Sequence, residues 1–146
     1  MKKNNMQIEI DANSLNISTL RVSVASFISI MPIQLDDLMD IKTALSEAIT
    51  NAIDHGYDKV PGKVIVKVSI YDEEKIVIEV IDYGKGIEDI ELAMTPTYTT
   101  KPEMEHAGMG FTIMESFMDQ VIIDSNVNKG TKILLTKTIK TKKSSS

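Results

Sequence analysis

Three polar side chains recur every four residues in one stretch of the sequence: Glu47, Asn51 and His55. On an α-helix this spacing places them along one flank, beside an apolar stripe, where they could line a cavity. Glutamate and asparagine oxygens suit Mg²⁺, and a glutamate held near a hydroxyl group can act as a general base. The same spacing is also typical of an ordinary solvated helix face, so spacing alone does not decide between the two interpretations.

A carboxylate at the end of a predicted strand is a more specific signal. Because side chains alternate along a strand, Asp82 falls on the same side as Ile78 and Val80, where the core should be. An ionised aspartate is costly there unless a partner donates to it, and an adenine amino group is one such partner. Gly84 and Gly86 follow, and glycine permits backbone angles and close approaches that other residues forbid. A plain strand end followed by a turn is the alternative interpretation.

Two further glycine motifs occur later in the chain, Gly108-Met109-Gly110-Phe111 and Gly130-Thr131. The first opens a predicted helix, where exposed N–H groups and the helix dipole favour phosphate. It fits neither the Walker pattern, which needs a following Lys-Ser or Lys-Thr, nor the dinucleotide fingerprint. The second motif begins a predicted strand and by itself indicates only a turn.

The elements that must position these residues follow from the spacing of apolar side chains. A period near 3.6 predicts helices over 17–31 and 34–55 and a short helix over 110–117, while alternation predicts strands over 7–11, 64–70, 76–82, 120–124 and 132–138. The strands at 64–70 and 76–82 form a hairpin, and Gly56 is expected to end the second helix. Residues 83–110 show no sustained period, and irregular segments of this length in a compact domain are usually functional.

Length and composition limit the class of protein. With 146 residues, 42% hydrophobic and 25% charged, the chain should form one globular domain over residues 1–139, followed by a fraying basic and serine-rich tail over 140–146. The formal net charge of -5 argues against a direct nucleic-acid partner. The lack of cysteine excludes disulfides and cysteine-based zinc sites and suits a reduced cytoplasm. The sequence shows no signal peptide and no membrane-spanning apolar run, so no membrane partner is expected.

Taken in order, the motifs resemble the sequence boxes of the GHKL ATPases, a superfamily that includes histidine-kinase catalytic domains, Hsp90 and MutL. The boxes are residues 47–52, 82–86, 108–110 and 130–131, and both their order and their spacing match. Within that superfamily, segments 46–57 and 99–115 are similar to the anti-sigma F factors of spore-forming bacteria. The resemblance extends over nearly the whole chain, from about Met6 to Thr138.

The resemblance implies both a fold and an activity. The expected fold class is α+β, a two-layer α/β sandwich of the Bergerat ATP-binding type, with a mixed, mostly antiparallel sheet and helices packed on one face. Proteins of this family hold a sporulation sigma factor inactive and, as serine-protein kinases, use Mg²⁺ and ATP to phosphorylate an anti-anti-sigma protein, leaving ADP. They work in the cytoplasm as homodimers. The expected partners are therefore a sigma factor, an anti-anti-sigma protein and a second copy of the chain.

The resemblance also implies roles for individual residues. Glu47 is expected to be the base that receives the serine hydroxyl proton, and Asn51 to hold the Mg²⁺ that bridges the phosphates. Asp82 is expected to bind the adenine amino group, helped through water by Thr131. Residues 91–107 are expected to form a lid over ATP. The other expected nucleotide contacts come from the glycine motifs and the lid: Gly84, Gly86, Thr99, Thr100, Lys101, Gly108, Met109, Gly110 and Phe111.

Two further positions bear on the resemblance to the family: Arg21 and the lid residue His106. Arg21, expected to be exposed on the first helix, matches the position at which the family contacts both protein partners. A charge that serves only solubility is the alternative. Relatives carry a lid arginine shortly before the glycine pair, whereas this chain has His106, which is mostly neutral near pH 7, so Lys101 is a second candidate for the charge.

Three alternative functions are left by the sequence. A histidine-kinase catalytic fragment would need a separate phospho-accepting helical domain. A general-stress anti-sigma kinase would have the same chemistry but a different sigma factor. A non-catalytic switch that senses ATP and ADP would not need Glu47.

Overall fold

The computed structural model describes residues 1–58, 60–94 and 110–139. These residues form one five-stranded sheet in the order β1-β2-β3-β5-β4. The strands are β1 (Lys2–Asp11), β2 (Lys63–Tyr71), β3 (Lys75–Asp82), β4 (Gln120–Asn126) and β5 (Gly130–Thr138). The α+β class is confirmed, although each pairing between the described strands is antiparallel, so the sheet is not mixed there as the resemblance implied.

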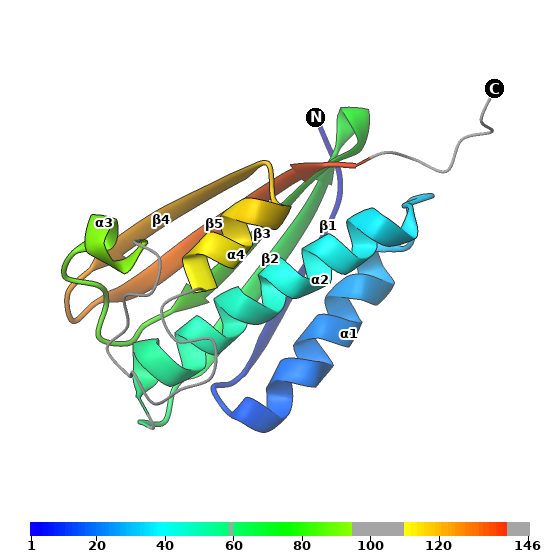
Figure 1. Ribbon diagram of the computed structural model, residues 1–146. Coiled ribbons are helices and arrows are strands. Elements are labelled where there is room, and N and C mark those ends of the chain that lie inside the picture. The colour runs from blue at the N-terminus through cyan, green and yellow to red at the C-terminus, as the bar shows by residue number, and fades with distance from the viewer. Residues whose placement is uncertain (59, 95–109, 140–146) are drawn as a thin grey trace.

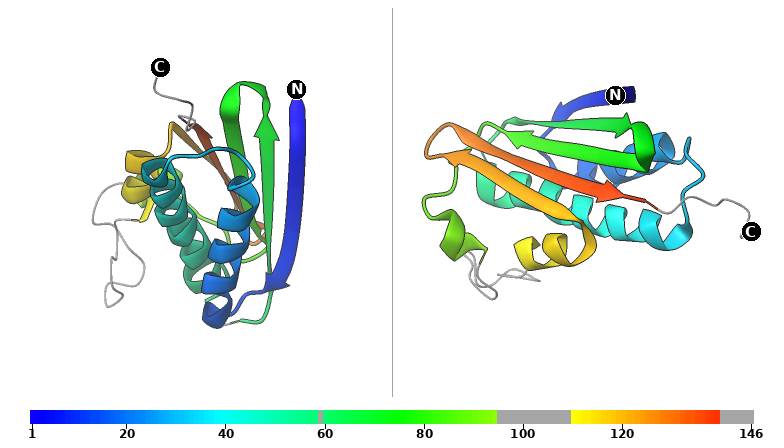
Figure 2. Two further views of the ribbon diagram at one scale, coloured as in Figure 1. Left: turned by 90° about the vertical axis from the view of Figure 1, so that its right-hand side faces the viewer. Right: turned by 90° about the horizontal axis from the view of Figure 1, so that it is seen from above.

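The helices cover one face of this sheet, as expected for a two-layer sandwich (Figures 1 and 2). α1 (Ile17–Ile28) packs against α2 (Leu35–Thr50), and α4 (Gly110–Phe117) packs against α2 as well. α2 continues directly into a π-helical segment, Asn51–Tyr57, and α3 (Ile90–Ala93) follows β3. No helix in the described part of the chain has both the length and the apolar character needed to cross a membrane.

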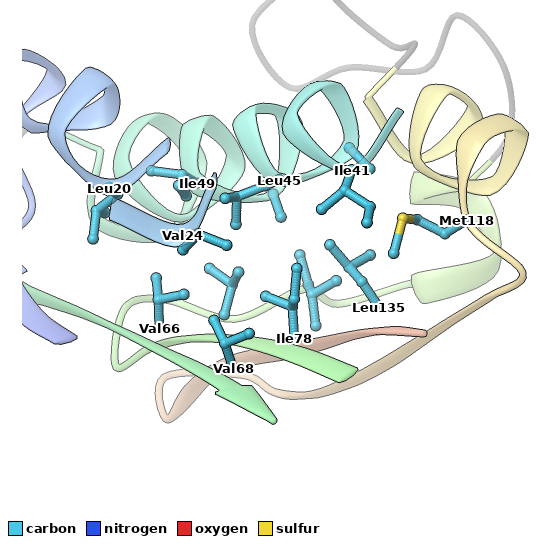
Figure 3. Packing of buried hydrophobic residues seen from close by; sticks show 14 of the residues in the cluster. Leu20, Val24, Ile41, Leu45, Ile49, Val66, Val68, Ile78, Met118 and Leu135 are labelled. Carbon is cyan, nitrogen blue, oxygen red and sulfur yellow. The ribbon is translucent and has the colours of Figure 1, made fainter. Parts of the chain in front are cut away.

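The core lies between the helices and the sheet (Figure 3). Its side chains come from the apolar stripe of each helix and from alternate positions of each strand, as the two periods predict. Fully buried members include Leu20, Val24, Ile41, Leu45, Ile49, Val66, Val68, Ile78 and Leu135. Because buried side chains of α2, β3 and β5 pack in this one core, the core fixes the positions of the ends of these elements.

Several element boundaries differ from the sequence predictions. β1 begins at Lys2 rather than at residue 7, because its polar first half also pairs with β2. α1 ends at Ile28, where the next residue, Ser29, donates its hydroxyl to a backbone carbonyl of the last turn. The second helix does not end at Gly56: it changes from α to π at Asn51 and ends with Asp58 in the left-handed conformation at φ 50°. The segment predicted to be irregular contains α3, and the predicted tail, 140–146, lies outside the described residues.

Candidate functional site

Two helices and two strands meet at one end of the sandwich, on the left in Figure 1. α2 and β3 contribute their C-terminal ends, and α4 and β5 contribute their N-terminal ends. At this end Glu47 approaches Gly110, the first residue of α4, because a β-carbon added to that glycine would lie 3.5 Å from Glu47 Oε1. Asp82 pairs with Thr131 across β3 and β5. The fold thus brings residues from all four sequence boxes to this end of the sandwich.

Asp82 is buried, with 3% of its surface exposed, at the inward-facing position that the strand alternation predicts. Its Oδ1 accepts the backbone N–H of Gly84 at 2.9 Å, and the backbone N–H of Thr131 also donates to the carboxylate. Burial raises the pKa of Asp82 to about 6, while the two N–H donors lower it and so limit the rise. The result is a buried carboxyl group with acceptor positions left for a ligand.

This carboxyl group predicts a measurable pH dependence of stability. Because the pKa of Asp82 in the folded chain, about 6, lies above its ordinary value of 3.8, protonation of Asp82 favours folding. Its stabilising contribution is complete below about pH 4 and is lost as the pH rises through 6. The free energy of unfolding of the wild type minus that of Asp82→Asn should therefore fall by about 2–3 kcal/mol between pH 4 and pH 7 in urea unfolding followed by circular dichroism. A difference that stays constant over this range would contradict the raised pKa.

The π-helical segment lies directly against this carboxylate. A β-carbon added to Gly56 would lie 2.8 Å from Asp82 Oδ1, and one added to Gly84 would lie 2.0 Å from the carbonyl oxygen of Gly56. That carbonyl also accepts the N–H of Lys85 at 2.8 Å. Gly56 therefore allows the end of α2 and the chain after β3 to meet under Asp82. Sequence reasoning missed this role because it assigned Gly56 only to the helix end.

The loop that follows Asp82 is held from two sides. The Tyr57 hydroxyl donates to the carbonyl of Lys63 and accepts the N–H of Tyr83 at 2.9 Å. Farther along the loop, Gly86 has φ 76° and packs against the backbone of β4, where a β-carbon would lie 2.2 Å from Asn126 O. The glycines at 84 and 86 thus serve close contacts within the protein itself.

Ser125, on β4, lies next to Thr131, which in turn pairs with Asp82. Ser125 Oγ lies 2.7 Å from Thr131 Oγ1, accepts the N–H of Ile87 at 2.8 Å and donates to the carbonyl of Gly130 at 3.1 Å. Sequence reasoning missed this residue. The signal was present, because Ser125 continues the inward-facing positions of Val121 and Ile123 just as Asp82 continues those of β3.

The three polar residues predicted to share one flank of the second helix lie in two kinds of helix. Glu47 and Asn51 are half-buried and one α-helical turn apart, because the N–H of Asn51 donates to the carbonyl of Glu47, whereas His55 lies within the π-helical segment, which has wider turns. The described residues contain no cluster of three or more histidine, cysteine, aspartate or glutamate side chains that could hold a metal ion. Asn51 fits a different arrangement, in which Mg²⁺ takes one protein oxygen and completes its shell with phosphate and water oxygens.

The structure also places Arg21 and Phe111, and Arg21 differs from the expectation. Arg21 is half-buried rather than exposed, because its Nη1 donates to Ser46 Oγ of α2 at 3.3 Å. The Phe111 side chain is buried in the core, which leaves only its backbone for a ligand. The other lid and glycine-pair predictions lie outside the described residues: Thr99, Thr100, Lys101, His106, Gly108, Met109 and the segment 95–107.

Solved structures with this fold include proteins of two kinds. The crystal structure of the RsbU and RsbW domains of a Mycobacterium tuberculosis protein superposes with a TM-score of 0.70 at 22% identity, covering 94% of this chain and 33% of that one. The catalytic domain of the histidine kinase ThkA superposes with a TM-score of 0.54 at 20% identity, covering 94% and 97%. At these identities the likeness establishes the fold.

Sequence comparisons establish the family. Residues 10–137 match the histidine kinase-like ATPase domain. The anti-sigma F factor of Clostridium kluyveri is 51% identical over 137 residues, which is 94% of this chain and 96% of that protein. The anti-sigma F factor of Geobacillus kaustophilus is 51% identical over 138 residues, or 94% of each chain. This chain belongs to the anti-sigma F factor family and is built on a histidine kinase-like ATPase domain.

Proposed function

We propose that this chain is an ATP-dependent serine-protein kinase that holds a sporulation sigma factor and phosphorylates the anti-anti-sigma protein that opposes it. The observation that carries the proposal is the position of Glu47. Its carboxylate lies beside the first residue of α4, at the same end of the sheet as the buried Asp82. The carboxylate that we propose as the general base therefore lies next to a helix N-terminus, which is suited to phosphate, in a histidine kinase-like ATPase domain.

The adenine and the phosphates of ATP each have a matching group in the site. Asp82, with Thr131 beside it, is an acceptor for the adenine amino group. Gly110 opens α4, whose N-terminal N–H groups favour phosphate. Asn51 would hold Mg²⁺, which neutralises charge on the phosphates during transfer. Residues 95–109, outside the described part of the chain, are proposed to supply the lid contacts.

The proposed reaction is phosphoryl transfer from ATP to a serine hydroxyl group. The serine Oγ of the substrate protein bonds to the γ-phosphorus, the bond from that phosphorus to the β–γ bridging oxygen breaks, and ADP leaves. Glu47 takes the serine proton. Phosphoryl transfer of this kind needs in-line positioning and charge stabilisation more than covalent help, so one base and fixed N–H donors can serve it.

The proposal extends to the partners and to the unit that binds them. Arg21 is the only arginine of the chain, and we assign it to the surface shared by the sigma factor and the anti-anti-sigma protein. Its bond to Ser46 sets its side chain between α1 and α2. Residues 1–139 act as one domain, two copies of which form the active dimer. The proposed setting is the cytoplasm.

The test is transfer of labelled phosphate. The purified chain is mixed with Mg²⁺, ATP labelled at the γ-phosphate, and the anti-anti-sigma protein of the same genome. We expect label on one serine of that protein, and binding of the sporulation sigma factor in a pull-down with the same preparation.

The alternatives predict different outcomes of the same experiment. ATP binding without transfer of label would show a non-catalytic switch. Transfer together with binding of a stress sigma factor, and none of the sporulation factor, would show the general-stress relative.

A further inference from the structure

The hydroxyl of Ser125 has three neighbours, and they fix the direction of its hydrogen bonds. A serine hydroxyl carries one hydrogen and can accept two hydrogen bonds. The N–H of Ile87 can only donate to it, and the carbonyl of Gly130 can only accept from it. The one hydrogen of Ser125 therefore goes to Gly130. The third contact, with Thr131 Oγ1 at 2.7 Å, is then satisfied only if Thr131 is the donor.

This arrangement decides what Thr131 can offer to a ligand. Its single hydroxyl hydrogen points to Ser125, so its remaining positions can only accept. Asp82, paired with Thr131 across the strands, is also an acceptor when ionised. Asp82 and Thr131 therefore offer a ligand two hydrogen-bond acceptors and no side-chain donor.

We propose that Ser125 is a specificity-determining residue, which commits the Thr131 hydrogen and so makes the site select purine nucleotides with a 6-amino group over those with a 6-oxo group. The inference rests on the proposed ATP site. A 6-amino group donates to this pair of acceptors. A 6-oxo group presents a carbonyl oxygen to them, which leaves buried acceptors facing each other without a hydrogen. Ser125 acts as a positioning residue, because it works through Thr131 and the loop at Ile87.

The test compares ATP with inosine triphosphate, which carries the 6-oxo group. Binding of each to the full chain is measured by titration calorimetry in Mg²⁺. We expect the wild type to prefer ATP. In Ser125→Ala the Thr131 hydroxyl is released and can donate, so the ratio of ATP affinity to inosine triphosphate affinity should fall by about tenfold or more.

Two further variants separate this role from a structural one. Ser125→Thr keeps the hydroxyl and should restore the wild-type ratio, whereas Ser29→Ala removes an exposed serine hydroxyl of the α1 end and should leave the ratio unchanged. An unchanged ratio in Ser125→Ala, or an equal loss of both affinities, would overturn the role of Ser125 while leaving the proposed function intact. Failure of the wild type to bind ATP would overturn the proposed function, and this inference with it.

Discussion

Replacing Glu47 by glutamine leaves ATP binding nearly unchanged and lowers the rate of phosphoryl transfer by about 10²- to 10⁴-fold. The glutamine side chain has the same shape and keeps the position beside Gly110, but it cannot take a proton. The loss should therefore appear in the rate of transfer at saturating ATP, measured as labelled phosphoserine in single-turnover reactions. Calorimetry on the same samples gives the ATP affinity.

A matched change elsewhere controls for the loss of one charge. Glu9 lies on the exposed side of β1, and Glu9→Gln should transfer phosphate at the wild-type rate. If Glu47→Gln lost ATP binding along with transfer, the carboxylate would have a role in holding Mg²⁺ or in folding. If it kept the wild-type rate, Glu47 would not be the base.

The larger elements of this fold could be predicted because apolar spacing determines them directly. The hairpin of β2 and β3, the helix α4 and the inward position of Asp82 all follow from periods of 2 and 3.6. The start of β1 could not be predicted, because residues 2–5 are polar and exposed and become a strand only through their pairing with β2. Polar, exposed parts of an edge strand are hard to predict in general, because pairing with the neighbouring strand rather than burial decides their structure.

The sequence predicted which residue types form the candidate site, but it did not predict the tertiary contacts that hold them in place. A carboxylate at a core position and glycines after a strand are visible in the sequence. The close approach of Gly56 to Asp82 is not, because it depends on a π-helical turn that brings residues 26 apart into contact. The bond between Ser125 and Thr131 likewise requires the pairing of β4 with β5. Tertiary packing decides such contacts, and local sequence carries little trace of them.

Replacing Asp82 by alanine should weaken ATP binding by about 2–4 kcal/mol, which corresponds to roughly 30- to 1,000-fold in affinity. The reason is that the buried carboxylate is the acceptor for the adenine amino group, and water cannot easily take its place at a residue only 3% exposed. The binding of inorganic tripolyphosphate, which has no base, should be nearly unaffected. Calorimetry with both ligands measures the difference.

The pKa of Asp82 adds a second signature to this prediction. Because the group must be ionised to accept from adenine, ATP affinity of the wild type should increase as the pH rises through about 6, while stability of the nucleotide-free chain falls over the same range. Asp82→Ala should remove both trends. Asp124→Ala, which deletes a carboxylate from the opposite face of the sheet, should keep both and bind ATP as the wild type does. If Asp82→Ala bound ATP with wild-type affinity, Asp82 would have no part in recognising the adenine. A different carboxylate would then have to cause the pH dependence of ATP affinity and of stability.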